Sequence, residues 1–197
     1  GKNKNYAELT FHYWFWKNYL SKCESKWIGF CHYRKFWTKE IHKSSEINIE
    51  KLSSIILKEI PKEFEQYDVI LGTPFYVNQS KIMKFLKKGL TIILEKPSRL
   101  FNPNERTIKF HFDLMHGEGN LDKAISLLEK NDREDFNYFV KTEVSFNPHN
   151  MFICKSNIIL NNYYETIFPW LKRCEKLFGF DLKGYGLKRI YGFLAER

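Results

Sequence analysis

The chain has 197 residues, of which 43% are hydrophobic and 28% are charged, and its formal net charge at pH 7 is +9. A chain of this length can bury a substantial core, and this balance of apolar and charged residues excludes a disordered tail or a collagen-like repeat. No run of roughly 18 uncharged apolar residues is present that would span a bilayer. The excess of Lys and Arg predicts an anionic partner: nucleic acid, an anionic membrane surface or a phosphorylated small molecule.

The cysteines and histidines argue against metal and disulfide chemistry. The four cysteines have neither the spacing of a zinc site nor the density of a disulfide-stapled secreted domain. The histidines lack an i, i+4 pair or accompanying cysteines. We therefore expect reduced thiols, a cytoplasmic location and no metal cluster.

The first third of the chain alternates helical and strand-like patterns. A helix is predicted from Asn5 to Leu20, with Asn5 as its N-cap and Glu8 completing a capping box. The short apolar run from Trp27 to Tyr33 is typical of an interior strand.

A second helix followed by a second strand is predicted in the next part of the chain. Asn48 is predicted to cap a helix that Pro61 ends, because proline cannot continue a helix. A second interior strand is predicted at Tyr67–Leu71. It ends at Gly72-Thr73-Pro74, a strand-to-loop transition of the kind that forms binding crevices in α/β sheets.

The rest of the chain continues this alternation, which predicts a single three-layer α/β domain over residues 1–197 with no internal repeat. Within residues 80–110 we predict a basic helix, a short apolar segment at Leu90–Leu94 and a loop. Helices are predicted at Leu121–Lys130 and Glu134–Val140, and a strand at Met151–Cys154. A helix from Asn157 to about Phe178, which Pro169 kinks or divides, and a helix at Leu187–Arg197 follow.

An ordered set of short motifs runs through nearly the whole chain. Its residues are Asn3, Tyr6, Glu8–Thr10, Tyr13, Trp14, Trp16–Asn18, Gly29, Cys31–Arg34, Tyr67, Asp68, Asn150–Phe152, Gly192, Phe193, Glu196 and Arg197. This set resembles the bacterial glycosyltransferase-like domains found in capsule and lipopolysaccharide gene clusters. Three features depart from that family: Lys35 stands where a second Arg is usual, residues 80–109 fit poorly, and the family's first strand would precede residue 1.

The resemblance implies a glycosyltransferase-A-like, Rossmann-like fold that lacks its first strand in this sequence. It also implies a hexosyltransferase-type reaction, in which a sugar passes from a nucleotide diphosphate donor, such as a UDP-sugar, to a capsular or lipopolysaccharide glycan. The implied partners are the nucleotide-sugar donor and a glycan or lipid-linked glycan acceptor. In many enzymes of that fold, an Asp-x-Asp motif after an interior strand holds a divalent cation against the diphosphate.

The corresponding place in this chain holds His32-Tyr33-Arg34. The planar guanidinium of Arg matches phosphate oxygens, and a charged hydrogen bond contributes about 1.5–3 kcal/mol. We therefore predict that Arg34 and His32 neutralise the leaving diphosphate beside Tyr33, helped by Lys35 or Arg189. The expected reaction needs no metal, although a divalent cation stays open as an alternative. The competing interpretation makes His32 and Tyr33 strand core residues and Arg34 a surface ion-pair partner.

An acceptor hydroxyl needs a base, and carboxylates are candidates. Each also has an ordinary structural interpretation, because Glu8 can serve the capping box and Glu196 can pair with a nearby Arg. Glu196 follows Arg189 by seven residues, which would place both on one helical face. The candidate bases are Asp113, Glu118, Asp122 and Glu196, and the residues given a donor-binding or structural role are Glu8, Thr10, Lys17 and Asn150.

Lys81–Lys88 alternates cations with apolar residues, which predicts either weak, salt-sensitive binding to the anionic inner leaflet or an ordinary amphipathic helix.

Two rival functions remain. The charge and the aromatic content fit a basic domain that binds single-stranded nucleic acid, but no known RNA- or DNA-binding motif is present, so no nucleic-acid partner is predicted. The other rival is a catalytically inactive glycosyltransferase-like binding module.

Overall fold

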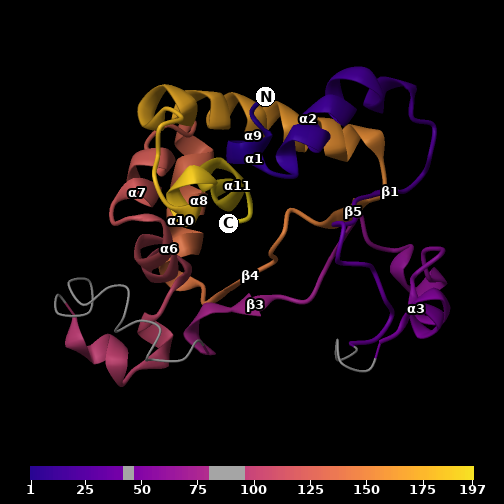
Figure 1. The fold of residues 1–197 in the computed structure, drawn as a ribbon, viewed down its shortest axis with the longest axis horizontal. Coiled ribbons are helices and arrows are strands. Elements are labelled where there is room, and N and C mark those ends of the chain that lie inside the picture. Colours follow the sequence, from indigo (N-terminus) through magenta and orange to yellow (C-terminus); the bar gives the residue numbers. More distant parts are fainter. Residues whose placement is uncertain (42–46, 80–95) are drawn as a thin grey trace.

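The computed structural model describes residues 1–41, 47–79 and 96–197, which form a mixed fold of helices and short strands (Figure 1). The mixed class agrees with the prediction. The predicted basic helix of residues 81–88 and the apolar segment Leu90–Leu94 lie outside the described residues.

Two small antiparallel sheets are formed by the described strands. The first has the order β1-β5-β2, with β1 at Ile28–Gly29, β5 at Phe152–Cys154 and β2 at Val69–Leu71. The second pairs β3 (Phe75–Tyr76) with β4 (Ser145–Phe146). The central strand β5 therefore joins two segments that lie about forty residues apart in the chain, and it brings residues 148–151 beside the end of β2.

The helices make up most of the remaining structure. The long helix α9 crosses one side of the molecule, with α1, α2 and α11 beside it and α6, α7 and α8 beneath one end (Figure 1). The bounds are α1 Asn3–Tyr6, α2 Leu9–Asn18, α3 Ile49–Ile55, α6 Ile108–His116, α7 Asn120–Ile125, α8 Lys130–Thr142, α9 Asn157–Phe178, α10 Tyr185–Lys188 and α11 Ile190–Ala195.

Aromatic rings fill much of the core. Tyr6 of α1 stacks on Tyr191 of α11 with ring centroids 4.8 Å apart. His12 of α2 is buried and its Nδ1 lies 2.9 Å from the hydroxyl of Tyr164 in α9. Burial lowers the pKa of His12 to about 4, so this imidazole is neutral at pH 7. His12 is therefore a neutral residue of the packed core.

One predicted helix and one predicted cap are confirmed. Helix α9 spans Asn157–Phe178 as predicted, its first turn is capped by the Ser156 hydroxyl, and Pro169 lies inside it without dividing it. Asn48 caps α3 by accepting from the Lys51 amide, although α3 ends several residues before Pro61.

The predicted helix from Asn5 to Leu20 and its capping box are wrong. The chain breaks at Ala7, whose φ of 50° lies in the left-handed region and separates α1 from α2. The Asn5 amide donates to the Lys188 carbonyl at 3.0 Å instead of capping a helix. The Glu8 carboxylate accepts from Asn150, 142 residues away, at 2.7 Å. Long-range hydrogen bonds have therefore displaced the local ones.

Other elements also differ from the prediction. The helix predicted at Leu121–Lys130 ends at Ile125, and Lys130 instead begins α8, which contains the helix predicted at Glu134–Val140. The strand predicted at Trp27–Tyr33 is reduced to Ile28–Gly29, because the chain after Phe30 turns at His32–Lys35. Residues 187–197 form parts of two helices that meet at Arg189, so Arg189 and Glu196 do not share one helical face. Helix α6 was not predicted; Thr107 caps it, and most of its residues are buried.

A tight contact between α10 and α6 gives a prediction for stability. A Cβ added at Gly186 would lie 2.3 Å from the backbone oxygen of Met115, which cannot swing aside. We expect Gly186→Ala to lower the free energy of unfolding by about 2 kcal/mol, because overpacking outweighs the better helix propensity of Ala. Urea denaturation measures this change. Gly72→Ala is the matched control, since its Cβ would meet only Trp37 at 3.9 Å; equal stability of the two variants would contradict the prediction.

Candidate functional site

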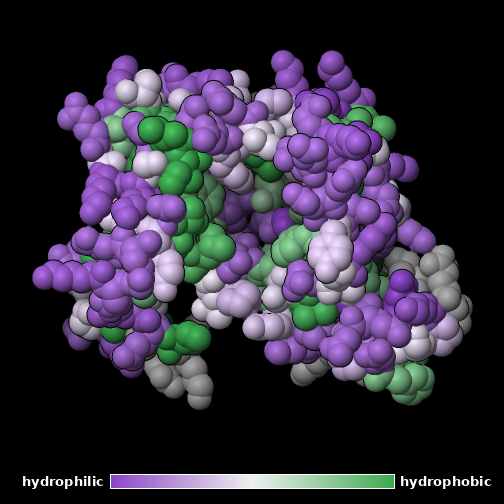
Figure 2. Space-filling model, turned by 180° about the vertical axis from the view of Figure 1, so that it is seen from behind, coloured by the Kyte–Doolittle hydropathy of each residue, from purple (hydrophilic) through white to green (hydrophobic). Residues whose placement is uncertain are grey.

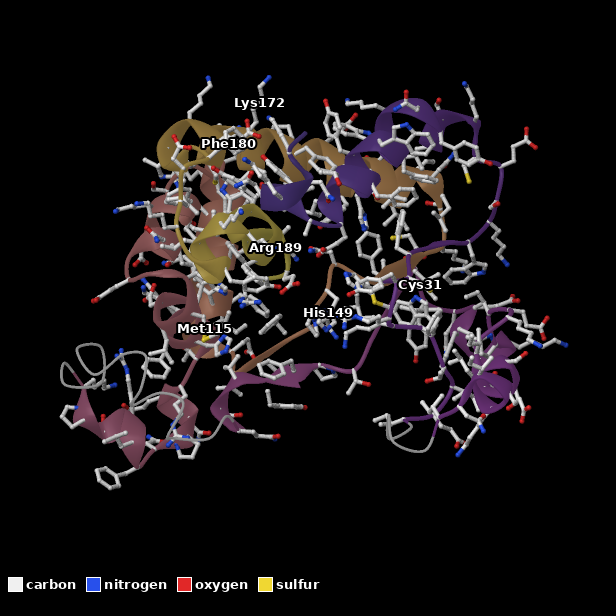
Figure 3. The ribbon with its side chains drawn as sticks, viewed as in Figure 1. Cys31, Met115, His149, Lys172, Phe180 and Arg189 are labelled. Atoms are coloured by element: carbon white, nitrogen blue, oxygen red, sulfur yellow. The ribbon has the colours of Figure 1, made fainter. Side chains whose placement is uncertain are left out.

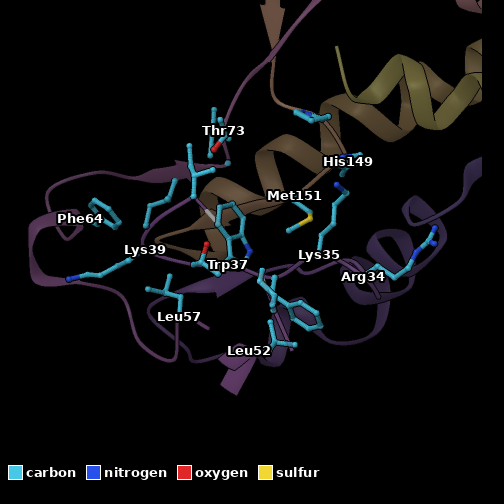
Figure 4. A pocket seen from close by; sticks show the side chains of 18 residues that line it. Arg34, Lys35, Trp37, Lys39, Leu52, Leu57, Phe64, Thr73, His149 and Met151 are labelled. Carbon is cyan, nitrogen blue, oxygen red and sulfur yellow. The ribbon is translucent and has the colours of Figure 1, made fainter. Parts of the chain in front are cut away.

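A cavity of about 730 Å³ opens beside the end of β2 (Figure 4). Its walls come from three parts of the chain: the loop after β1, the end of β2 with the loop that follows, and the segment that leads into β5. The lining residues are Arg34, Lys35, Phe36, Trp37, Thr38, Lys39, Ile41, Ile47, Leu52, Leu57, Phe64, Ile70, Leu71, Gly72, Thr73, Pro148, His149 and Met151. The strand-to-loop transition at Gly72 and Thr73 was predicted from the sequence as a binding crevice.

Side-chain hydrogen bonds hold the three walls together. The Trp37 indole N–H donates to the Phe30 carbonyl at 2.9 Å, which fixes the loop after β1. The Trp37 ring also lies against Gly72, where a Cβ would be 3.9 Å away. The Asn147 amide donates to the Gly72 carbonyl at 2.6 Å, which joins the β2 loop to the segment before β5. These hydrogen bonds fix the positions of the three chain segments that form the cavity walls.

The charge of the cavity is positive. Arg34, Lys35 and Lys39 line it, and none of its described lining residues is Asp or Glu. Lys39 has an exposed partner, because its ammonium lies 3.2 Å from the Glu63 carboxylate. For Arg34 and Lys35, no ion pair is found with any described residue. Lys35 extends toward His149, whereas the Arg34 guanidinium lies at the edge of the cavity, over the exposed ring of Tyr33 (Figure 4). A bound anion would therefore meet Lys35 inside the cavity and Arg34 at its rim.

His149 lies in the cavity wall (Figure 4), in the segment between β4 and β5 (Figure 3), and its backbone conformation is unusual. Its φ is 77° and that of Asn150 is 50°, and such left-handed values in residues other than glycine concentrate at functional sites. The His149 ring centroid lies 6.3 Å from that of His32. Burial, followed by the nearby Lys35 and His32, lowers the pKa of His149 to about 4. A neutral imidazole therefore faces the cavity at pH 7.

Two carboxylates from opposite ends of the chain meet at the segment of His149 and Asn150. The Asn150 amide donates to Glu8 at 2.7 Å, and the backbone N–H of His149 donates to the Glu196 carboxylate. Burial raises the pKa of Glu196 to about 7; the Arg197 guanidinium opposes this rise and Glu8 adds to it. A buried carboxyl group whose pKa is raised in this way is a candidate for acid–base chemistry.

Buried polar groups surround this pair. The Arg197 guanidinium lies 3.5 Å from Glu196 and 3.7 Å from the centroid of the Phe146 ring. Desolvation lowers the pKa of Arg197 to about 10, so the side chain stays cationic at neutral pH. Asn150 is 5% exposed, and its amide oxygen has no hydrogen-bond partner in the part of the chain that the structure describes. That oxygen is therefore a buried acceptor, although Asn150 is not among the residues that line the cavity.

The residues predicted to hold a diphosphate are brought together in part. Arg34 and Lys35 line the cavity, and His32 adjoins it through His149. Tyr33 is 73% exposed and stacks beneath the Arg34 guanidinium at 4.6 Å, so it is not a strand core residue. Arg189 lies at the end of α10, with its guanidinium 5.1 Å from the Tyr185 ring centroid, and it is not among the lining residues.

The other predicted bases lie in a second cavity of about 560 Å³. Asp113 and Asp122 both accept from the Lys109 ammonium, at 2.7 and 2.6 Å. Burial raises the pKa of Asp113. Glu118 lines the same cavity, whereas Glu196 lines neither this cavity nor that of Arg34 and Lys35, which it adjoins through the His149 backbone. The structure thus groups Asp113, Glu118 and Asp122 together and separates them from Glu196.

Two further predicted residues have local partners on the first helices. The Thr10 hydroxyl donates to the Ala7 carbonyl at 2.8 Å, across the break between α1 and α2. The Lys17 ammonium lies 3.2 Å from the Trp16 ring centroid on the outer side of α2. Neither residue lines the cavity.

Sequence reasoning missed His149 and Trp37 as site residues. His149 was weighed only as a metal ligand, yet it stands in a run of Asn147, Pro148, His149 and Asn150, a composition typical of a turn that tolerates left-handed backbone. That turn could have indicated where backbone strain and polar side chains gather. Trp37 gave no such signal, because an isolated Trp is equally typical of a core.

The described residues contain neither a metal-binding cluster nor a membrane-spanning helix. Within residues 1–41, 47–79 and 96–197, no three His, Cys, Asp or Glu side chains lie close enough to share a metal ion. No helix in those same ranges has the length and apolar character needed to cross a membrane.

Comparison with known proteins places this geometry in context. No curated protein matches the chain. Among solved structures, the apo structure of the WbbM bifunctional glycosyltransferase is similar, with a TM-score of 0.69 and 22% sequence identity over 99% of this chain and 32% of that chain. The chain thus shares a fold with a protein of which it spans about a third of the length. The family described as a domain of unknown function (DUF4422) matches residues 1–197. Because this match covers all residues, the chain belongs to the DUF4422 family.

Proposed function

We propose that the protein is a glycosyltransferase of the hexosyltransferase type, which moves a sugar from a nucleotide diphosphate donor such as a UDP-sugar to a capsular or lipopolysaccharide glycan. The observation that carries the proposal is the cavity in which Arg34 and Lys35 lie without a carboxylate partner among the described residues. The shared fold with a bifunctional glycosyltransferase supports it. The proposal includes a glycosyltransferase-A-like, three-layer arrangement for the fold and, with four free cysteines, a cytoplasmic location.

The cavity offers contacts for both parts of a nucleotide diphosphate, the phosphates and the nucleobase. In the proposed complex the diphosphate lies against Arg34 and Lys35, whose charges stabilise the negative charge that develops as the sugar leaves. The rings of Trp37, Phe36 and Phe64 line the same cavity and supply an apolar surface for the nucleobase. Fixed cations would thereby take the role of a metal.

Glu196 is the proposed base. The acceptor hydroxyl oxygen forms the bond to the anomeric carbon, the bond from that carbon to the diphosphate breaks, and the hydroxyl proton passes to Glu196. A carboxyl group with a pKa near 7 is suited to this transfer, because it is partly ionised at neutral pH and holds the proton well enough to accept it. The Asn150 amide and the His149 backbone hold the two carboxylates in place.

Nucleotide binding tests the proposal directly. UDP is expected to raise the thermal unfolding temperature in the presence of EDTA, with a saturable concentration dependence, because ligands that bind the folded state stabilise it. AMP and a single-stranded oligonucleotide serve as comparison ligands. Stabilisation by UDP only when Mn²⁺ or Mg²⁺ is added would overturn the metal-free site. Salt-dependent oligonucleotide binding without a response to UDP would favour the nucleic-acid alternative, and no response to either would favour an inactive binding module.

A further inference from the structure

The outer face of α2 exposes a group of aromatic side chains. We define the α2 face as Phe11, Tyr13, Trp14 and Lys17; Tyr19, the residue that follows α2, is exposed beside it. Phe11 is 54%, Trp14 52% and Tyr19 50% exposed to solvent. The opposite side of the same helix is buried through Leu9, His12 and Phe15.

Two rings of the α2 face lie against each other, and the Tyr13 ring packs against Phe168 of α9 with centroids 5.0 Å apart. Phe11 stacks on Trp14 with centroids 6.0 Å apart and an interplanar angle of 21°. The Asn18 amide donates to the Trp14 carbonyl at 2.8 Å and closes the end of the helix. These rings are held in place on the surface, so the face is a preformed apolar platform.

The apolar surface continues beyond α2. A shallow groove lies beside α2 and the start of α9, and Trp16, Leu20 and Ile158 contribute to its lining. Ile158 is 68% exposed. Large apolar side chains exposed together on neighbouring elements mark an interaction surface, whereas scattered ones do not.

Two lysines adjoin the platform. Lys17 lies on the α2 face and Lys22 in the 3₁₀ turn η1 (Leu20–Lys22) that follows it. Neither forms an ion pair with any residue that the structure describes. Both cations are therefore available to an anionic surface beside the aromatic rings.

We propose that the α2 face binds the surface of an anionic phospholipid bilayer. Trp and Tyr rings favour the headgroup level of a membrane, and Lys side chains there are attracted to anionic lipid. Phe11, Trp14 and Ile158 supply apolar groups able to enter the boundary between headgroups and acyl chains. Lys17 and Lys22 supply the charge.

This surface is separate from the cavity of Arg34 and Lys35. None of the residues of the α2 face lines the cavity of Arg34 and Lys35. Figure 2 shows the molecule from behind: hydrophilic residues cover much of this side, a band of hydrophobic residues runs down its left part, and the surface is hollowed near its centre. The inference goes beyond the proposed sugar transfer, and it holds whether or not that reaction is confirmed.

A neutral glycan is the main competing occupant, since sugars also stack on aromatic rings. The two lysines favour the bilayer, because a neutral sugar gains nothing from their charge. A second copy of the chain is the other competitor, and two such basic faces would repel each other. Vesicle flotation, glycan retention and light scattering distinguish these three occupants.

Vesicle flotation tests the proposal. The wild-type protein is expected to float with vesicles that contain phosphatidylglycerol and to remain behind with vesicles of phosphatidylcholine alone. The Phe11→Ala, Trp14→Ala double variant should bind the anionic vesicles at least about tenfold more weakly, because two half-exposed rings no longer enter the interface. Replacing Lys17 or Lys22 with Ala should weaken binding about fivefold for each lysine.

A matched control removes aromatic rings from another part of the molecule. Phe101 follows the 3₁₀ turn η5 (Pro97–Leu100) and Tyr138 lies on α8, and they are 86% and 71% exposed. The Phe101→Ala, Tyr138→Ala double variant should float like the wild type. Thermal unfolding of all variants, with and without UDP, reports folding and the cavity separately from membrane binding.

Three results would overturn the proposal. One is equal flotation of the wild type and the Phe11, Trp14 double variant. Another is retention of the wild type on an immobilised neutral glycan through Trp14 without any flotation. The third is self-association, seen as a concentration-dependent rise in light-scattering mass that Trp14→Ala abolishes while vesicles have no effect.

Discussion

Replacing both Arg34 and Lys35 with Ala is expected to weaken UDP binding by about a hundredfold or more. Each side chain offers a charged hydrogen bond to the diphosphate, and such bonds contribute about 1.5–3 kcal/mol each. Since neither cation has an ion-pair partner among the described residues, their loss leaves no internal carboxylate unpaired. Isothermal titration with UDP in EDTA measures the change, and thermal unfolding checks that the double variant folds.

Lys39 is the matched control for this double variant. It lines the same cavity, but its ammonium is already paired with the exposed carboxylate of Glu63 at 3.2 Å. We expect Lys39→Ala to change UDP affinity by less than about threefold, because an exposed pair contributes little. Equal losses in the two variants would show that net charge, and not the placement of Arg34 and Lys35, governs binding. Undiminished binding by the double variant would remove the diphosphate site from this cavity.

The elements predicted well are those whose signals are local. Helix α9 carries a serine cap and a long apolar periodicity, and both its ends agree with the prediction. The cap at Asn48 and the loop at Gly72 are also local signals. In each case the side chain acts on its own backbone or its immediate neighbours, so the sequence contains the whole interaction.

The elements predicted wrongly depend on partners far along the chain. Asn5 and Glu8 have the spacing of a capping box, yet their side chains bond to residues 183 and 142 positions away. The positive φ of Ala7, which breaks the helix, allows this arrangement. Local spacing cannot reveal which of two satisfactory hydrogen bonds a buried side chain makes, because the fold makes that choice.

The candidate site shows the same division. The sequence predicted Arg34 and the separate importance of Glu8, Asn150 and Glu196. It could not show that the last three meet, because they come from the two ends of the chain and from the turn before β5. The role of His149 also depends on that meeting: its backbone holds Glu196 while its ring faces the cavity.

Glu196→Gln is expected to lower kcat for sugar transfer by about 10²- to 10⁴-fold, the usual contribution of a positioned base, while UDP affinity changes little. Gln keeps the shape and cannot take a proton. For the wild type, activity should rise with pH through a midpoint near 7, because the base works when ionised. The remaining activity of the variant should lack this rise. Rates at several pH values, at saturating donor, measure both effects.

Stability gives a second measure that does not depend on turnover. Because the folded-state pKa of Glu196 is raised above its ordinary value of 4.5 to about 7, the protonated carboxyl stabilises the fold at low pH. That contribution is lost as the pH rises from 4.5 through about 7. The amide that replaces the carboxyl in Glu196→Gln cannot ionise, so this variant should be relatively more stable against the wild type at pH 8 than at pH 5. Urea denaturation at the two pH values measures the difference.

Asp122→Asn is the control that discriminates between the candidate bases. Asp122 was predicted from the sequence as a base, but it shares the Lys109 ammonium with Asp113 in the second cavity. We expect this variant to keep kcat within about threefold of the wild type and to keep the rise in activity through pH 7, since a partly exposed ion pair contributes little. A large loss of kcat in Asp122→Asn with normal turnover in Glu196→Gln would move the base to the second cavity. The carboxylate pair at Asn150 would then serve only to hold the two ends of the chain together.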